Sequence, residues 1–159
     1  MMNLFKRRWL QVAALTAVSA TILVGCGKEE DKQAVKTSET TKSEPLKIAF
    51  AYVGPVGDGG WTFAHDNARK AIEKEFGNKI QTSYVESVPE SADAERVFRD
   101  MAGQGNKLIF GTSFGYMEPM LKVAADHPNI NFEHATGYKQ APNMRTYDSR
   151  TYEGAYLSG

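Results

Sequence analysis

The sequence predicts an α/β domain in which a parallel sheet carries helices on both of its faces. From Leu46 onward, short apolar runs alternate with longer segments whose apolar residues recur at helical spacing. The first run, Ile48 to Val53, is apolar at successive positions, which is typical of a strand covered on both sides. Glycine-rich turns follow the first and third runs. Regular alternation of strands and helices favours right-handed crossovers and therefore a parallel sheet.

The first strand leads into a predicted helix over residues 61 to 76, and Gly77 is well placed to end it. Its apolar residues lie three or four positions apart, so we expect them to form the face that packs on the sheet. These residues are Trp61, Ala64, Ala68, Ala71, Ile72 and Phe76.

The remaining elements follow the same alternation. The predicted strands cover residues 80 to 85, 108 to 110, 131 to 135 and 144 to 147. The second helix has an apolar face of Ala94, Val97, Phe98, Met101 and Ala102, and Gly103 and Gly105 end it. The third helix has an inner stripe of Met117, Met120, Leu121 and Ala124, with Pro119 in its first turn. A further helix is expected from Tyr152 onward.

The amino terminus is typical of a lipoprotein signal peptide. A basic start of Lys6, Arg7 and Arg8 precedes an apolar stretch, and Leu23-Val24-Gly25-Cys26 closes it. We expect residues 1 to 25 to be removed and Cys26 to be acylated, which would anchor the protein on the outer side of the cell membrane. The alternative is a short membrane anchor or an incidental cysteine, although the stretch is shorter than the roughly 20 residues that a span needs.

Residues 26 to 45 are rich in Lys, Glu, Ser and Thr and have little to bury, so they predict a flexible tether before a domain over residues 46 to 159. After processing, 16 basic residues stand against 19 acidic ones, a net charge of −3. This balance disfavours nucleic acid as a partner. With Cys26 as the single cysteine, no disulfide is expected within the mature chain.

The loop after the first strand is the first candidate binding site. It contains Asp58, Gly59, Gly60 and Trp61, where a strand leads into a helix start. In open parallel sheets, small molecules bind beyond the carboxyl ends of the strands. Glycines let a ligand approach the backbone, Asp58 supplies an acceptor, and Trp61 supplies a flat aromatic face. The loop therefore predicts a site for a planar, polar small molecule.

The loop after the third strand is the second candidate, with Ser113, Phe114, Gly115 and Tyr116. Both loops should open on the same edge of the sheet and could share one ligand. The Ser113 hydroxyl, N–H groups at the helix start, and the ring of Phe114 or Tyr116 would contribute. The alternative is that the two rings belong to the core and that Ser113 only caps the helix. A nucleobase, a nucleoside and a sugar all remain compatible with these residues.

Enzymatic alternatives have less support. A dinucleotide fingerprint would place Thr62 at its third glycine, and Glu86 could hold a ribose, but Trp61 would crowd a pyrophosphate. His65 and Asp66 are adjacent on a helix and point apart, and Glu133 and His134 face opposite sides of a strand. Three scattered histidines give no metal motif. We therefore expect no catalysis, no metal and no cofactor.

Several motifs, in order, resemble the basic membrane protein family of solute receptors of ABC transporters, most closely its purine-binding and nucleoside-binding lipoproteins. The resemblance covers residues 46 to 159 and rests on GPVGDGGWTFAHDNARKA, YVESVPESADAERV, GNKLIFGTSFGYMEP, FEHATGYK and TYEGAYLSG.

The resemblance implies two α/β lobes of the periplasmic-binding-protein type, joined by a hinge, that close on a purine base or nucleoside and present it to a permease. Trp61 would stack on the base, Asp58 would lie near its polar contact, and residues 113 to 116 would form the second binding loop. We expect residues 46 to 159 to be an incomplete first lobe. The alternatives are a sugar receptor, a signalling receptor of the same shape and a nucleotide-using enzyme of the Rossmann type.

Overall fold

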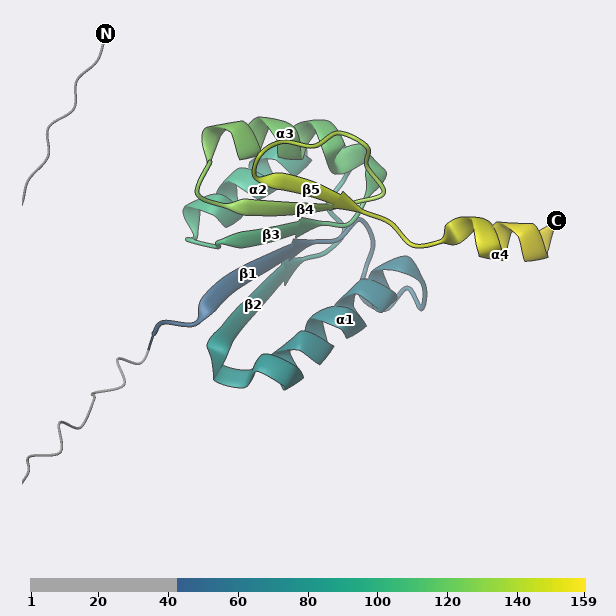
Figure 1. The fold of residues 1–159 in the computed structure, drawn as a ribbon, viewed down its shortest axis with the longest axis horizontal. Helices are drawn as coiled ribbons and strands as arrows, with labels where there is room; N and C mark the ends of the chain where they lie inside the picture. The colour runs from purple at the N-terminus through teal and green to yellow at the C-terminus, as the bar shows by residue number, and fades with distance from the viewer. Residues whose placement is uncertain (1–42) are drawn as a thin grey trace, which may run out of the picture. The chain divides into compact units, whose positions relative to one another are not determined.

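The computed structural model describes residues 43–159, which form a five-stranded parallel sheet in the order β2-β1-β3-β4-β5 (Figure 1). The strands are β1 Leu46–Ala51, β2 Ile80–Val85, β3 Leu108–Gly111, β4 Asn131–Ala135 and β5 Met144–Tyr147. The helices are α1 Trp61–Phe76, α2 Ala92–Gly103, α3 Met117–Asp126 and α4 Thr151–Ser158, with short 3-10 turns η1 Gly77–Lys79 and η2 Phe114–Tyr116. The predicted fold class is confirmed.

The register brings the two candidate loops to one edge of the sheet. Ala51 at the end of β1 pairs with Val85 of β2 on one side and with Gly111 of β3 on the other. The carboxyl ends of these strands are therefore level, and α1 and η2 both begin beyond them (Figure 1). This arrangement follows from the parallel crossovers and positions the site.

The face of the sheet that α2 and α3 cover holds a closed apolar core. Ala49, Ala51 and Ile109 point into it from the strands. Phe98 of α2 and Met120 of α3 are fully buried against them. The predicted inner faces of both helices agree with this packing, because their apolar residues are buried or packed against this core.

The other face carries α1, and here the expected packing holds for Ile72, which packs against Ile48, Phe50 and Tyr52, but not for the rest of the stripe. The buried residues of α1 are the polar ones, Thr62, Asp66 and Arg69. Ala64 and Ala68 are exposed, and Phe76 is 48% exposed. The helix is rotated so that its polar side lies against the sheet, because Arg69 finds partners there.

Arg69 is held by several groups at once. Its Nε donates to Asp66 Oδ1 at 2.8 Å, and its Nη1 donates to Thr82 Oγ1 at 3.0 Å. Its guanidinium lies 4.8 Å from the centre of the Tyr84 ring. A buried guanidinium with partners for its N–H groups avoids the desolvation penalty of an unpaired charge.

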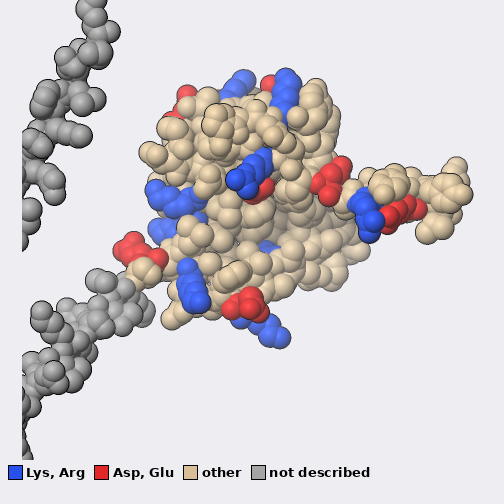
Figure 2. All heavy atoms as spheres, in the orientation of Figure 1, with Lys and Arg blue, Asp and Glu red and all other residues tan. Residues whose placement is uncertain are grey.

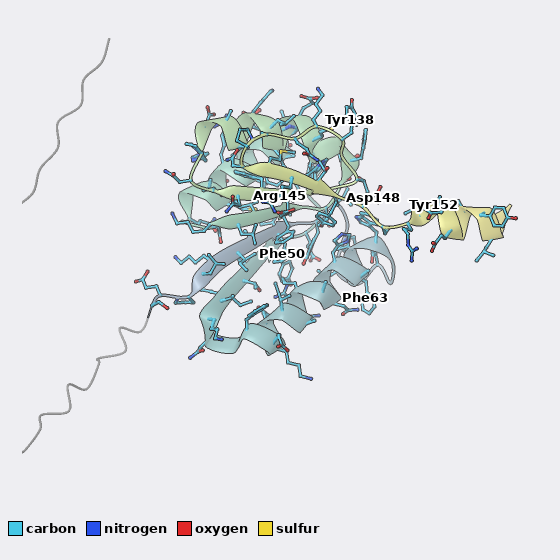
Figure 3. All side chains as sticks on the ribbon, in the orientation of Figure 1. Phe50, Phe63, Tyr138, Arg145, Asp148 and Tyr152 are labelled. Atoms are coloured by element: carbon cyan, nitrogen blue, oxygen red, sulfur yellow. The ribbon has the colours of Figure 1, made fainter. Side chains whose placement is uncertain are left out.

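The apolar stripe of α1 borders an open groove of about 520 Å³ between the helix and the strands. Phe50 lies in this space in Figure 3, and Figure 2 shows mostly uncharged atoms there. The stacked rings of Phe50 and Phe110, 4.6 Å apart, form its floor. The groove is lined by Phe50, Ala64, His65, Ala68, Arg69, Ile72, Phe110, Glu133 and Tyr147.

The predicted signal peptide, Cys26 and most of the predicted tether lie outside the described residues. Every residue of α4 is exposed. Within residues 43–159, no helix combines the length and the hydropathy that crossing a bilayer requires.

Candidate functional site

Asp58 organises the loop between β1 and α1. Its Oδ1 accepts hydrogen bonds from the backbone N–H groups of Gly60 at 2.8 Å and Phe63 at 2.9 Å, and its Oδ2 accepts one from Thr62 N–H at 2.9 Å. Gly59 between them has a φ of 66°, a left-handed conformation that glycine adopts without strain. Asp58 therefore satisfies N–H groups that the first turn of a helix leaves unpaired.

These bonds also change the charge state of Asp58. The N–H groups of Gly60, Phe63 and Thr62 hold the pKa of the Asp58 carboxyl below its ordinary value, because they stabilise the carboxylate. Asp58 was predicted to accept a hydrogen bond from a ligand beside unpaired N–H groups of the helix start. In the structure those N–H groups donate to Asp58 itself, and contact between Asp58 and a ligand stays a prediction.

Trp61 joins the two loops. Its indole Nε1 donates to the carbonyl oxygen of Thr112, at the end of β3, at 2.6 Å. The side chain is 38% exposed, and its ring centre lies 4.6 Å from that of His65 at an angle of 54°. The hydrogen bond fixes the indole at the carboxyl edge of the sheet and leaves part of its surface accessible.

The second loop is closed by Glu90, which comes from the connection between β2 and α2. Glu90 Oε1 accepts from Gly115 N–H at 2.9 Å and from the hydroxyl of Ser113. A Cβ on residue 115 would fall 2.6 Å from Glu90 Cδ, so glycine is required for this close approach. The N–H group that the sequence analysis left free for a ligand is thus occupied.

The two aromatic residues of this loop differ in burial. Phe114 is 55% exposed, and its ring centre lies 6.3 Å from that of Tyr138 in the loop between β4 and β5. Tyr116 is fully buried, contacts the Phe98 ring edge-on at 5.4 Å, and donates its hydroxyl to Val88 O at 2.6 Å. Of the two alternatives for these rings, the core position therefore holds for Tyr116, and Phe114 is left as the exposed aromatic face.

His134 of β4 is hydrogen-bonded to the second loop. It is fully buried in β4, and its Nε2 lies 2.7 Å from Ser113 O. Burial lowers the pKa of the imidazole, so the neutral ring donates from Nε2 to this carbonyl. The sequence analysis did not find this role, and it correctly expected Glu133 and His134 to face opposite sides, since Glu133 lines the groove.

The carboxylate of Glu86, which would hold a ribose in a dinucleotide site, is hydrogen-bonded within the chain. Its Oε2 accepts from the backbone N–H of Val56 at 2.7 Å, across the two loops that follow β1 and β2. Val56 lies in the segment where a dinucleotide would approach, and the position of the third fingerprint glycine is filled by buried Thr62. These contacts give the dinucleotide alternative no support.

The remaining titratable residues are arranged for structure. Asp66 pairs with Arg69 at 2.8 Å and with Lys70 at 2.7 Å, so it is not available as an acid-base partner for His65. Within residues 43–159, no three His, Cys, Asp or Glu side chains lie close enough together to hold a metal ion. The carboxyl edge of the sheet carries exposed aromatic rings, backbone groups and carboxylates, which are groups suited to binding a small molecule.

The predicted site residues lie on the two loops at the carboxyl edge, and none of them lines the groove beneath α1. Figure 3 shows Tyr138 and Phe63 on opposite sides of this edge. Phe63 and Tyr138 are 45% and 70% exposed. Neither residue was among the predicted site residues, which include Trp61 and Phe114.

A family model described as ABC transporter substrate-binding protein PnrA-like (Bmp) matches residues 46–159. The purine-binding protein of Brucella abortus is 55% identical over 116 residues, which cover 73% of this chain and 33% of that protein. A protein of Haloferax volcanii, named as a glucose-binding component of an ABC transporter, is 39% identical over 93% of this chain and 44% of its own length. The chain thus spans a third to under half of these relatives.

Solved structures give the same fold. A solute-binding protein of an ABC transporter from Conexibacter woesei superposes with a TM-score of 0.59 at 21% identity, over 65% of this chain and 35% of that one. A solute-binding protein from Aeropyrum pernix superposes with a TM-score of 0.60 at 23% identity, over 72% and 31%.

Proposed function

The chain belongs to the Bmp family of PnrA-like ABC transporter substrate-binding proteins, and from this premise we propose that it is part of a receptor for a purine base or nucleoside. The receptor binds its ligand without making or breaking a covalent bond. The similarity to the Brucella abortus purine-binding protein supports this ligand class. The protein delivers the ligand to an ABC permease.

One observation carries the proposal: the partly exposed indole of Trp61 is hydrogen-bonded to Thr112 O, between the two loops at the carboxyl edge. A flat heterocycle stacks on such a ring whatever its substituents, and stacking of one base on an aromatic side chain contributes about 1 to 3 kcal/mol. Phe114 and the backbone of Gly59 would complete this half of the site. Ser113 and Gly115 keep it in place through Glu90.

Asp58 has a changed role in this proposal. Because its carboxylate is engaged by three backbone N–H groups, it supports the helix start that carries Trp61. Tyr116 likewise acts through the loop it anchors and not through contact with the ligand. The ligand contacts on this lobe thus reduce to Trp61, Phe114 and exposed backbone.

We also propose the domain organisation and location that the sequence predicts. Residues 1 to 25 would be a signal peptide, Cys26 the lipidated residue, residues 26 to 45 a tether, and residues 46 to 159 part of a first lobe. The lipid on Cys26 would hold the protein on the outer side of the membrane. Radioactive palmitate should label the wild-type protein and not Cys26→Ser, and an unlabelled wild type would contradict the anchor.

A sugar receptor is the second candidate, because the Haloferax volcanii relative is named as glucose-binding. The higher identity to the purine-binding relative favours the purine. Mass spectrometry of the small molecules that co-purify with the full-length protein separates the two. We expect adenine, guanine or a nucleoside of either. A sugar in their place would overturn the proposed ligand class, and competition calorimetry with adenine, guanosine and glucose would confirm the assignment.

A further inference from the structure

The helix starts that follow β1 and β3 are occupied by carboxylates of the chain itself. Asp58 accepts from the N–H groups of Gly60, Thr62 and Phe63 at the start of α1. Glu90 accepts from Gly115 N–H where η2 leads into α3. The positions at which a helix would normally receive a phosphate are therefore already filled by negative groups.

The two carboxylates flank the proposed ligand face. Asp58 precedes Trp61 by three residues, and Glu90 contacts Ser113, the residue after the Thr112 carbonyl that holds the indole. Glu86 adds a third carboxylate on the loops of the same edge, bonded to Val56 N–H. Three carboxylates thus lie on the loops at the edge that carries Trp61.

The basic groups near this edge are engaged elsewhere. Lys139 pairs with Glu118 of α3. Arg150 pairs with Glu153 of α4 at 3.1 Å. His65 beside Trp61 has its Nδ1 2.8 Å from Trp61 O, so that ring nitrogen faces the backbone of its own helix. Lys139 and Arg150 thus each face a carboxylate of the chain, and one ring nitrogen of His65 faces its own helix.

The N–H of Gly115 could also donate to a neutral oxygen, such as that of serine, asparagine or glutamine, in a weaker bond than the one to a carboxylate. The charge of Glu90 strengthens this bond but is not needed for one to form. The charge also repels other anions, which is one way in which a site rejects a wrong ligand.

We propose that Glu90, together with Asp58, makes this edge selective against phosphorylated ligands, so that the receptor takes uncharged bases or nucleosides and rejects nucleotides. The inference rests on the proposed function and assigns Glu90 as a specificity-determining residue. A nucleoside monophosphate would bring two negative charges toward carboxylates that already hold the available N–H groups.

The test compares adenosine with adenosine 5′-monophosphate by calorimetry on the full-length protein. We expect wild type to bind adenosine at least about a hundredfold more tightly. Glu90→Gln keeps the side-chain oxygen that accepts from Gly115 and should narrow this ratio about tenfold, the Coulomb effect of one charge about 6 Å from a dianion in water. Glu75→Gln at the opposite end of α1 removes the same charge far from the edge and should leave the ratio unchanged.

Equal affinities of wild type for the two ligands, or an unchanged ratio in Glu90→Gln, would overturn the selectivity while leaving the purine receptor intact. Should glucose bind and adenosine not, the ratio of glucose to glucose 6-phosphate is measured in the same variants. If that ratio depends on Glu90, the selectivity against phosphorylated ligands is supported and the purine ligand class is rejected. If no member of either pair binds, both proposals are rejected.

Salt provides a readout on the wild type, should Glu90→Gln fail to fold by circular dichroism. Raising the ionic strength from about 0.01 to 0.5 M screens exposed charges and should lower the ratio of the two affinities several-fold. A ratio that does not respond to salt would contradict charge repulsion as its cause.

Discussion

The two loops at the carboxyl edge are built in opposite ways. The loop after β1 is closed by Asp58, whose partners lie within five residues of it in the sequence. The loop after β3 is closed by Glu90, 23 to 25 residues earlier, and by His134 from β4. The Asp58 bonds can form as soon as the helix forms, whereas the Glu90 and His134 bonds depend on the assembled sheet. Substitutions in the two should therefore act on different properties.

The largest expected effect is on stability, at Tyr116. Tyr116→Ala removes a fully buried ring that packs on Phe98, so the free energy of unfolding should fall by about 3 to 5 kcal/mol. Urea denaturation measures it. Tyr116→Phe is the matched control, losing only the bond to Val88 O, and should cost about 1 kcal/mol. A loss below about 1 kcal/mol in the alanine variant would mean that Tyr116 is not a core residue.

The next effect is on binding, at Trp61. Trp61→Ala should weaken the purine ligand at least about tenfold in calorimetry, because the stacking face is lost. Trp61→Phe keeps an aromatic face but cannot donate to Thr112 O, so it separates stacking from the link between the loops. Unchanged affinity in Trp61→Ala would show that the ligand does not stack on the indole.

A smaller effect is expected at the helix start. Asp58→Ala should lower the melting temperature by about 4 to 8 °C, since the N–H groups of the first turn lose their acceptor. Asp58→Asn keeps one oxygen and should lose less. If alanine and wild type melt together in a thermal scan, the loop is held by other contacts.

The Asp58 effect should also depend on pH. The pKa of Asp58 is lowered in the folded protein, so its bonds stabilise the fold above the unfolded value of about 3.9 and are lost as the pH falls through the folded value. The melting-temperature difference between wild type and Asp58→Asn should be constant from pH 6 to pH 5 and fade below about pH 4. If the melting-temperature difference instead grew at low pH, the pKa of Asp58 would be raised and not lowered by folding.

The smallest stability effect is expected at Phe114. Its side chain is 55% exposed, so Phe114→Ala should change the free energy of unfolding by about 0.5 kcal/mol or less. Comparing this variant with Tyr116→Ala tests whether Phe114 lies on the exposed side of the loop and Tyr116 on its buried side. A large loss of unfolding free energy in Phe114→Ala, measured by urea denaturation, would contradict this assignment.

The fold was predictable because it depends on regular patterns. Short apolar runs with helical segments between them specify a parallel sheet, and the residues that alternate along β1 do divide between two cores. The orientation of α1 was not predictable in this way. Its alanine stripe suggested the inner face, but alanine buries little area, while Arg69 gains several partners by turning inward.

The meeting of the two loops at one edge was predictable, but the contacts within them were not. Trp61 and Phe114 were proposed as ligand contacts because aromatic residues after a strand and beside glycine are a local signal, and this role stays a prediction. Glu90 gave no such signal, because it stands next to Ser91, the cap of α2, and would be taken for an ordinary acid at that helix start. Glu90 accepts hydrogen bonds from Ser113 and Gly115 in the loop after β3, and only the folded sheet brings these residues together.

The link from the Trp61 indole to Thr112 O also has a consequence for how quickly and how tightly a ligand can be held. A free tryptophan side chain would have to give up its rotational freedom at the moment of capture, at an entropic cost of about 0.5 to 1.5 kcal/mol for a mobile side chain. Here that freedom is given up during folding, so the ring is already oriented for the heterocycle that we propose to stack on it.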